Sequence, residues 1–165
     1  MSIRIIVKEP DPVLREVAKE VTKFTPNLHK LLNDMADTMY DAEGVGLAAP
    51  QIGISKRVIV VDIGEEESGL IEVVNPVIVL SEGEQFGPEG CLSIPNLNGD
   101  VSRADRVKVA GQDRNGNPIE VDASGFLARA FQHEIDHLNG ILFTDLAENV
   151  YDITQQQSRR RKSGE

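Results

Sequence analysis

The chain has 165 residues, of which 40% are hydrophobic and 27% are charged, and this composition is ordinary for a globular protein with a proper core. The formal net charge of −10 at pH 7 argues against broad binding of nucleic acid over the whole surface. A single cysteine, Cys91, excludes a disulfide within the chain and suits a reducing compartment.

The N-terminal segment predicts neither a signal peptide nor a membrane anchor. Its apolar run, Ile5-Ile6-Val7, is too short for the core of a signal peptide. No later segment reaches the length of a membrane span. We therefore expect a cytoplasmic protein that forms one domain over residues 1–165.

Two helices are predicted in the first quarter of the chain. Asp11 caps a short helix with Pro12 at its first position, and Thr25 and Pro26 open a longer helix in the same way. Gly44 is the predicted C-cap of the longer helix. Its apolar stripe, at the helical period, is Leu28, Leu31, Leu32, Met35 and Met39.

The middle of the chain is predicted to consist mainly of strands, because β-branched residues occur there in runs or in alternation. Asn115-Gly116-Asn117 is typical of a hairpin turn. The segments with this strand pattern are 57–63, 71–80, 82–86, 101–110 (the least regular) and 119–122.

A helical period returns after Ser124, which can cap a helix that ends before Gly140. Helices at both ends with strands between them predict an α+β fold. In this fold mostly antiparallel sheets pack around a helix that carries residues 133–137, with further helices at the N-terminus.

Residues 133–137 read His-Glu-Ile-Asp-His and contain two of the three histidines of the chain. Side chains four residues apart lie on one face of a helix, so His133 and His137 can bind one metal ion. Glu134 lies beside them and can move a proton. The alternative is an ordinary helix with two surface histidines.

A catalytic metal site usually has three protein ligands and an open position, so a third donor is needed. One class of metallopeptidases has a downstream histidine where this chain has Phe143, which cannot bind metal. Another class uses a downstream glutamate, but Glu148 lies beyond the predicted helix end. The remaining donor is Cys91, whose thiolate is a strong ligand for zinc, iron, cobalt or nickel. Gly87, Pro88 and Gly90 break the strand pattern before it, which favours a ligand at a loop edge over a buried apolar cysteine.

A glycine-rich segment, GVGLAAPQ at residues 44–51, can let a substrate backbone approach closely. It lacks the lysine of a phosphate-binding loop and does not follow a strand in a βαβ unit. At its end, the amide of Gln51 can donate a hydrogen bond to a substrate oxygen.

Taken in order, GVGLAAPQ at 44–51, EGCLS at 89–93 and HEIDH at 133–137 resemble the three motifs of the peptide deformylase family. The resemblance covers nearly the whole chain. It implies a hydrolase that removes the N-formyl group from the initiator methionine of newly made polypeptides. It further implies one divalent metal ion, Fe²⁺ above all, with Zn²⁺, Ni²⁺ or Co²⁺ as alternatives, held by Cys91, His133 and His137.

The same resemblance assigns the remaining roles. Glu134 is implied as the general acid and base, and Gln51 with the backbone N–H of Leu92 as the site for the developing oxyanion. The implied substrate-binding residues are Val45 and Gly46 along the cleft, and Glu89 with the inner face of residues 126–133 around the methionine pocket.

The chain departs from the family at Asn98, where many members have an arginine, so contacts with the substrate peptide are expected to differ. Residues from about 154 to 165 are expected to form a flexible tail. Its basic cluster of Arg159, Arg160, Arg161 and Lys162 is either solvated or a docking segment for the ribosome.

Three other functions stay open at this point. A zinc endopeptidase would cleave unformylated peptides and would need a third ligand after His137. A binding module with a structural metal would need four protein ligands, and the chain has no second cysteine. A related hydrolase could act on other formylated amines.

Overall fold

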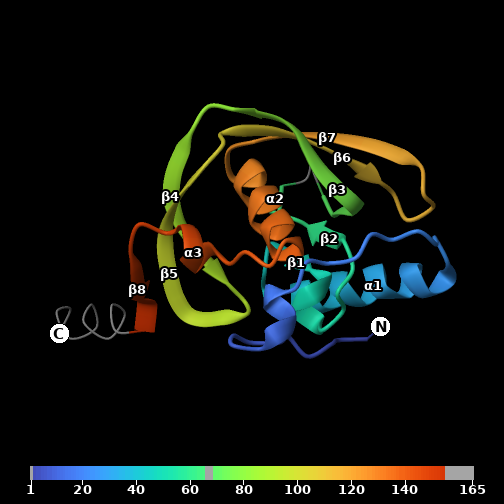
Figure 1. Ribbon diagram of the computed structural model, residues 1–165, viewed down its shortest axis with the longest axis horizontal. Helices are drawn as coiled ribbons and strands as arrows, with labels where there is room; N and C mark the ends of the chain where they lie inside the picture. The colour runs from blue at the N-terminus through green and yellow to red at the C-terminus, as the bar shows by residue number, and fades with distance from the viewer. Residues whose placement is uncertain (1, 66–68, 155–165) are drawn as a thin grey trace.

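The computed structural model describes residues 2–65 and 69–154 (Figure 1). The predicted basic cluster at residues 159–162 therefore lies outside the described residues, as does all of the tail after Thr154. No helix in the two described ranges is long and apolar enough to cross a membrane. In chain order the elements, with η for a 3₁₀ helix, are η1 (Pro12–Arg15), α1 (Pro26–Asp41), β1 (Gly46–Ala48), η2 (Ala49–Ile52), β2 (Val58–Val61), β3 (Ile71–Glu82), β4 (Gln85–Cys91), β5 (Ile94–Arg103), β6 (Arg106–Gln112), β7 (Pro118–Ser124), α2 (Gly125–Leu138), α3 (Phe143–Leu146) and β8 (Val150–Asp152).

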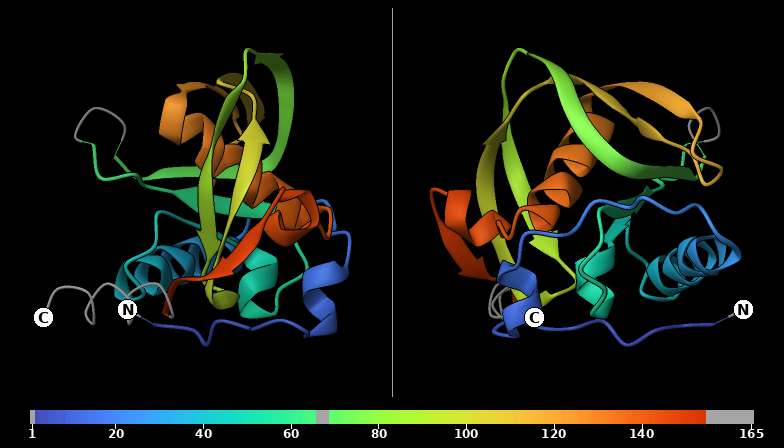
Figure 2. Two further views of the ribbon diagram at one scale, coloured as in Figure 1. Left: turned by 90° about the vertical axis from the view of Figure 1, so that its left-hand side faces the viewer. Right: turned by 45° about the vertical axis from the view of Figure 1, so that its right-hand side comes forward.

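Within the described residues the strands form two antiparallel sheets. One has five strands in the order β1-β2-β3-β6-β7, and the other has three in the order β4-β5-β8. The chain passes from the first sheet to the second between β3 and β4, two strands that are joined by a short loop (Figures 1 and 2). The predicted α+β class with antiparallel sheets is confirmed.

Helix α1 begins where the sequence predicts, but it ends differently. The Thr25 side chain accepts a hydrogen bond from the Leu28 N–H at 3.4 Å, and the apolar stripe is buried. The predicted C-cap at Gly44 is wrong. Glu43 adopts the left-handed conformation (φ +58°), and the Gly44 N–H then donates to the Met39 carbonyl at 2.9 Å. The helix is thus closed one residue earlier, which leaves Gly44 to lead into β1.

The predicted helix at Asp11 is only the 3₁₀ helix η1. Asp11 caps it as expected, accepting a hydrogen bond from the Val13 N–H at 3.1 Å. Beyond it the chain turns extended, because Lys19 exchanges backbone hydrogen bonds with Ser55 and Arg57. These long-range bonds satisfy the backbone that a longer helix would have paired locally.

The strands of the middle are mostly where the sequence predicts, with two corrections. β2, β3 and β7 match the predicted segments, and the hairpin turn lies between β6 and β7. The segment 82–86 is not a separate strand, since Glu82 ends β3 and β4 begins at Gln85. The segment 101–110 is divided between β5 and β6 by a turn at Ala104 and Asp105.

The break predicted before Cys91 is also wrong, because Gly87, Pro88 and Gly90 lie within β4. β4 is an edge strand of its sheet, and an edge strand tolerates a proline that cannot donate a hydrogen bond. The register with β5 shifts only between Gly90 and Cys91. Cys91 is therefore the last residue of a strand, directly before the turn at Leu92 and Ser93, so the predicted loop edge is confirmed although the strand before it is unbroken.

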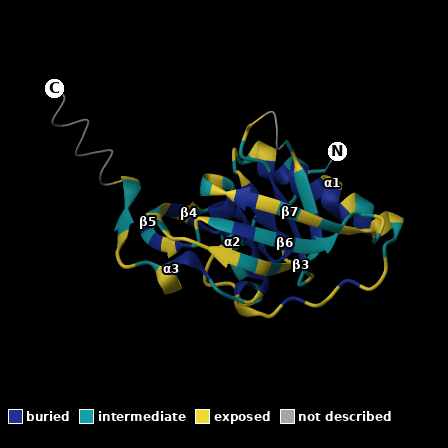
Figure 3. Cartoon of the chain, turned by 90° about the horizontal axis from the view of Figure 1, so that it is seen from above, coloured by how far each residue is buried: buried dark blue, intermediate teal, exposed yellow. Residues whose placement is uncertain are grey.

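Helix α2 starts after Ser124 and ends before Gly140, as predicted. Its buried residues Phe131, Ile135 and Leu138 pack in one apolar cluster with residues of β2, β3 and β6, among them Ile59 and Val107. Figure 3 shows the outer side of this sheet, where β7 alternates between exposed and less exposed residues along its length. The predicted pattern did not include β1, α3 or β8, which are too short for a period to show.

Candidate metal centre and substrate pocket

Three side chains with metal-binding atoms meet at one end of α2. The ligand atoms of Cys91, His133 and His137 all lie within 4.8 Å of one another. The Cys91 Sγ is 3.3 Å from the His137 Nε2, and the two imidazole rings are 5.0 Å apart at an angle of 69°. The helix and the end of β4 thus bring together the three donors that the sequence predicted. Among the described residues Glu148, the other donor considered, is not part of such a group.

The His133 ring is oriented by a carboxylate. Its Nδ1 donates a hydrogen bond to the Glu89 Oε1 at 2.9 Å, which leaves Nε2 for the cluster. Arg103 donates to both oxygens of Glu89 at 2.8 Å, and Arg129 donates to Oε2 at 2.6 Å. Glu89 lines the pocket as expected, but its buried carboxylate faces these three side chains. Burial works to raise the pKa of Glu89, but its hydrogen bonds to Arg103 and His133 outweigh burial and lower it well below the usual value.

His137 has different surroundings. Its Nδ1 is buried and has no hydrogen-bond partner in the part of the chain that the structure describes. Burial, followed by the charge of His133, lowers the pKa of His137 well below its ordinary value. A neutral imidazole is the form that binds a metal, so His137 is ready to act as a ligand.

The charges of the site suit a cation. Burial works to lower the pKa of His133, but negative charge on Glu134 and Cys91 and the hydrogen bonds to Cys91 and Glu89 outweigh it and raise that pKa. A group of donors that attracts a proton in this way also attracts a divalent ion, and sulfur with two imidazoles is a donor set for a transition metal. The residues therefore fit a metal of this kind.

Glu134 is buried next to the cluster. Burial raises its pKa to about 7, the largest effect on this carboxyl, so the side chain can both hold and release a proton near neutral pH. Its Oε1 has no hydrogen-bond partner among the described residues. Gly46 of β1 packs against it, and a β-carbon at position 46 would lie 2.9 Å from the Glu134 Cδ and Cγ. Gly46 thus leaves the space that this carboxylate occupies.

Gln51 of η2 is held with its amide nitrogen toward the cluster. The Ala48 N–H donates to the Gln51 Oε1 at 3.0 Å, which fixes the orientation of the amide. The Nε2 donates to the Ser93 Oγ at 3.2 Å and lies 3.6 Å from the Cys91 Sγ. A donor aimed at the edge of a group of side chains that could hold a metal can stabilise negative charge that develops there.

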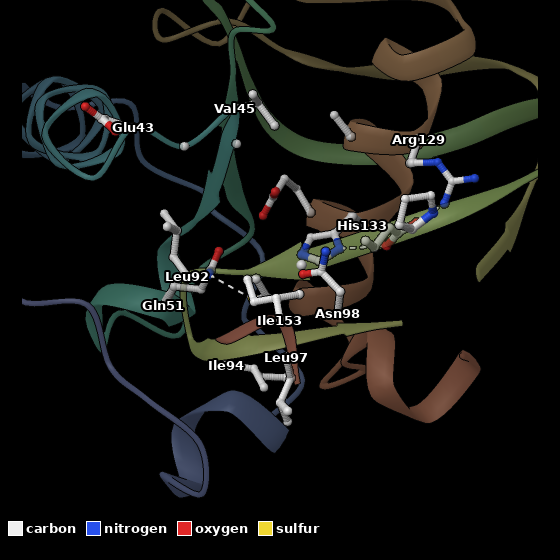
Figure 4. A pocket seen from close by; sticks show the side chains of 18 of the residues that line it. Glu43, Val45, Gln51, Leu92, Ile94, Leu97, Asn98, Arg129, His133 and Ile153 are labelled. Atoms are coloured by element: carbon white, nitrogen blue, oxygen red, sulfur yellow. Dashed lines mark hydrogen bonds and ion pairs between the residues drawn. The ribbon is translucent and has the colours of Figure 1, made fainter. Parts of the chain in front are cut away.

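A pocket of about 350 Å³ opens in front of Cys91, His133 and Glu134. Figure 4 shows Val45, Leu92, Asn98 and Ile153 around His133, from four separate parts of the chain. The wall also includes Gly44, Gly46, Gln51, Pro88, Ile94, Phe126, Arg129 and Ala130.

Several residues of the site had no assigned role in the sequence analysis. Arg103 and Ser93 are buried partners of Glu89 and Gln51, and no local pattern connects them. Ile153 follows the short strand β8, which pairs with β5 opposite Asn98. Arg129 had a visible signal, since it precedes His133 by four residues and so shares its helix face.

A half-buried cysteine and two buried histidines, with a carboxylate beside them and a pocket in front, define a site of the metallohydrolase class. The family model described as Polypeptide deformylase matches residues 3–152. The chain belongs to this family, whose members depend on a metal.

Individual relatives agree with the family match. A peptide deformylase of Pelotomaculum thermopropionicum is 59% identical over 150 residues, which cover 91% of this chain and 95% of that protein. The crystal structure of a Legionella pneumophila peptide deformylase has a TM-score of 0.86 at 49% identity, over 96% of this chain and 92% of that one. A Synechococcus elongatus peptide deformylase, solved in complex with actinonin, has a TM-score of 0.84 at 44% identity and covers 88% of this chain and 79% of that one.

Proposed function

We propose that this chain is a metal-dependent hydrolase that removes the N-formyl group from the formylmethionine of nascent polypeptides and releases formate. The observation that carries this proposal is the convergence of Cys91, His133 and His137, with Glu134 and Gln51 beside Cys91 and His133 in the wall of one pocket. These are the motif positions that the family resemblance assigns, and they come from three distant segments.

Cys91, His133 and His137 would hold one divalent ion, and Fe²⁺ is the ion we propose, with Zn²⁺, Ni²⁺ or Co²⁺ as alternatives. The sulfur and imidazole donors suit all four ions, and the preference for Fe²⁺ rests on the family resemblance alone. When bound, such an ion supplies a Lewis acid that polarises a carbonyl and acidifies a water molecule. A thiolate donates more charge than a third imidazole, so the protein's own proton acceptor gains importance.

Glu134 is the proposed proton carrier. Its buried carboxylate accepts one proton from the attacking water and returns it to the amine that leaves, so that the peptide departs with a neutral amino group. The second proton of the water leaves with formic acid, which ionises to formate in solution. The proposed ligand set of Cys91, His133 and His137 does not include Glu134, so the Glu134 carboxylate is free to accept and return the proton.

Gln51 and the backbone N–H of Leu92 are proposed to donate hydrogen bonds to the formyl oxygen as negative charge develops on it. The Gln51 amide is fixed by Ala48 and Ser93 before any substrate enters, and such preorganised donors need no reorientation during the reaction. Losing one donor of this kind typically raises the barrier by about 3–4 kcal/mol.

The pocket wall is proposed to select the substrate. Val45 and Gly46 border the space for the peptide, and the exposed apolar face of Phe126 suits a methionine side chain. Glu89 shapes this pocket from behind, through Arg129 and His133. Asn98 offers an amide to the peptide where many members of the family have a guanidinium. Its side chain has a shorter reach and no charge, so its contacts with the peptide differ from those of an arginine.

We also propose that residues 1–165 act as one catalytic domain in the cytoplasm, since a single free thiol suits a reducing compartment. The basic cluster of Arg159 to Lys162 is proposed to contact the anionic surface of the ribosome. Replacing these four residues by serine should weaken binding to ribosomes at low salt and leave hydrolysis of a short peptide unchanged.

The decisive assay measures formate release from formyl-Met peptides with anaerobically prepared protein of known metal content. Turnover with iron, nickel or cobalt is expected, together with no cleavage of the same peptides without the formyl group. An absence of formate release with all three metals would overturn the proposal. Cleavage within unformylated peptides would point to the endopeptidase, and turnover confined to other formylated amines would point to the related hydrolase.

Replacing Cys91 by serine tests the proposed ligand set. A hydroxyl is a far poorer ligand than a thiolate for these ions, so Cys91→Ser should lose metal during dialysis against a chelator under conditions in which the parent protein keeps it. Metal content per chain, measured by elemental analysis, is the readout. Equal metal retention in the two proteins would remove Cys91 from the ligand set.

A further inference from the structure

We infer that Arg129 is a positioning residue for the metal centre, acting on His133 through the carboxylate of Glu89. The inference rests on the proposed function, because it assumes that His133 is a ligand. Arg129 is buried on α2, four residues before His133 and on the same helix face. A buried guanidinium is costly unless its donors are paired, so its partners indicate what it does.

The partners of Arg129 lie on the strands opposite the helix. Its Nη1 is 2.6 Å from the Glu89 Oε2, 3.1 Å from the Val101 carbonyl and 3.4 Å from the Gly87 carbonyl. Its Nε donates to the Gln85 Oε1 at 3.3 Å. These bonds connect α2 with β4, which ends at Cys91, and with β5, which begins just after it. Arg129 therefore ties the helix that carries two proposed ligands to the strand that carries the third.

The hydrogen bonds of Glu89 show how Arg129 acts on His133. Oε1 accepts from His133 and Arg103, whereas Oε2 accepts from Arg103 and Arg129. Arg103 alone bonds both oxygens, which fixes the carboxylate within the plane of that guanidinium, but the carboxylate could still tilt out of this plane and change its angle to the imidazole. The bond from Arg129 adds a second fixed direction on the far oxygen. The position of Oε1, and with it the direction of the His133 Nε2, is thereby set.

Charge alone would predict the opposite effect of losing Arg129. Arg103 is shared between Glu89 and Asp136, whose Oδ2 lies 2.5 Å from its Nη1. Arg129 supplies the second positive charge of this group. Removing that charge makes the surroundings of His133 more negative, which by itself strengthens the binding of a cation. Weaker metal retention after the removal of Arg129 would therefore indicate that Arg129 acts by orienting His133. Stronger retention would indicate that it acts through its positive charge.

The test compares Arg129→Met and Arg129→Lys with the parent protein loaded with Ni²⁺ or Zn²⁺. Methionine keeps an apolar side chain of similar length in the pocket wall, and lysine keeps the charge but not the planar fork. Loss of metal to a chelator is followed with time by elemental analysis. Outer-shell partners of metal ligands typically contribute 10- to 100-fold to metal affinity, so we expect loss to be about tenfold faster in both variants.

Phe126→Ala is the matched control, since Phe126 lines the same pocket from α2 and has no part in the Glu89 network. It should raise KM for a formyl-Met peptide and leave the rate of metal loss unchanged. Arg129→Met should lower kcat more than it changes KM. Far-ultraviolet circular dichroism and thermal unfolding of each metal-loaded variant identify any protein that fails to fold. If Arg129→Met does not fold, the rate of metal loss from Arg129→Lys tests the inference.

Two results would overturn the inference. Unchanged or slower metal loss in a folded Arg129→Met or Arg129→Lys variant would leave Arg129 as a part of the pocket wall only. An equally large effect of Arg129→Met when Glu89 is already glutamine would show that Arg129 does not act through Glu89. Failure of the proposed function is recognised separately, because the parent protein would then release no formate.

Discussion

The two sides of the Cys91, His133 and His137 cluster are held in place by different forces. On the side of the five-stranded sheet, α2 is held by apolar packing, with Phe131 and Leu138 wholly buried. On the side of β4 and β5, the contacts are hydrogen-bonded ion pairs of the buried Arg103 and Arg129 with buried Glu89, and of Arg103 with half-buried Asp136.

This difference separates stability from orientation. Apolar burial is strong and has no direction, so it holds the helix against the sheet without setting the angle of a ring. A buried ion pair adds little net stability because of its desolvation cost, but its hydrogen bonds have fixed directions. We therefore expect changes on the apolar side to lower the free energy of unfolding, and changes on the ionic side to alter the metal centre.

The largest effect is expected where the two sides meet, at Glu134. Glu134→Ala should lower kcat for formate release by about 10²- to 10⁴-fold, the usual contribution of a general acid and base. The variant should keep its metal, because the three proposed donors are intact. Glu148→Ala, an exposed position, is the control and should retain both metal and activity. Near-full activity of Glu134→Ala would remove the assigned role.

On the apolar side, Phe131→Ala should lower the free energy of unfolding by about 3–5 kcal/mol, as is usual for a buried phenylalanine. Phe131 is fully buried in the cluster that joins α2 to the five-stranded sheet. Phe126→Ala on the same helix is the exposed control and should change stability by no more than about 0.5 kcal/mol. Urea unfolding measures both, and equal losses would contradict the division between the two sides.

Gly46→Ala should change the geometry of Glu134 without altering the apolar packing of α2 or the ion pairs between α2 and the strands β4 and β5. The added carbon would lie 2.9 Å from the Glu134 Cδ and Cγ, which is too close, so the carboxylate must shift. A displacement of about 1 Å can cost about 10²-fold in rate, and kcat should fall on that scale while metal content stays unchanged. Gly44→Ala is the control, because its new carbon would lie close only to the movable end of Leu92, 2.9 Å from Cδ1, and at an ordinary contact distance of 3.7 Å from the Met39 Cγ. Equal kcat values for the two variants would contradict this account of Gly46.

The smallest effect is expected far from both sides, at Asp34 of α1. Arg4 donates to this buried carboxylate at 2.7 and 2.9 Å, and Lys30 donates at 3.0 Å. Burial works to raise the pKa of Asp34, but these hydrogen bonds outweigh it and leave the pKa below its ordinary value.

Because the pKa of Asp34 is lower in the folded state, its contribution to stability is present above the unfolded pKa of about 3.9 and is lost as the pH falls through the folded pKa. Asp34→Asn should therefore be less stable than the parent protein at pH 7, and the difference should shrink on acidification. Urea unfolding at a series of pH values measures it. Arg4→Met should show the same trend, and a constant difference at all pH values would exclude this role of Asp34.

The elements that the sequence predicted well are those with a local cause. Thr25 and Pro26 open α1 because a cap and a fixed φ act within a few residues, and the period of α2 places His133 and His137 on one face. The predictions were wrong where contacts with distant segments determine the local conformation. The chain after η1 is extended because Lys19 bonds to Ser55 and Arg57, and neither partner is near it in sequence.

For the metal centre, residue chemistry alone was enough to nominate Cys91 beside the two histidines, since few donors were available and the motifs followed one order. The predicted strand break before Cys91 was wrong, because β4 continues through Pro88 to Cys91, whereas the predicted loop edge at Cys91 is confirmed by the turn that follows it. An edge strand can include a proline, and whether a strand lies at an edge depends on the order of the sheet and not on its own sequence.

The donor types, the helix that presents the histidines and the family were therefore accessible from the chain as written, because each depends on residue identity and short spacing. How the ligands are oriented was accessible only after folding. Glu89, Arg103 and Arg129 meet through the packing of α2 on β4 and β5, and Gly46 meets Glu134 through the packing of α2 on β1. These contacts join residues 14 to 88 positions apart, and no local pattern encodes such distances.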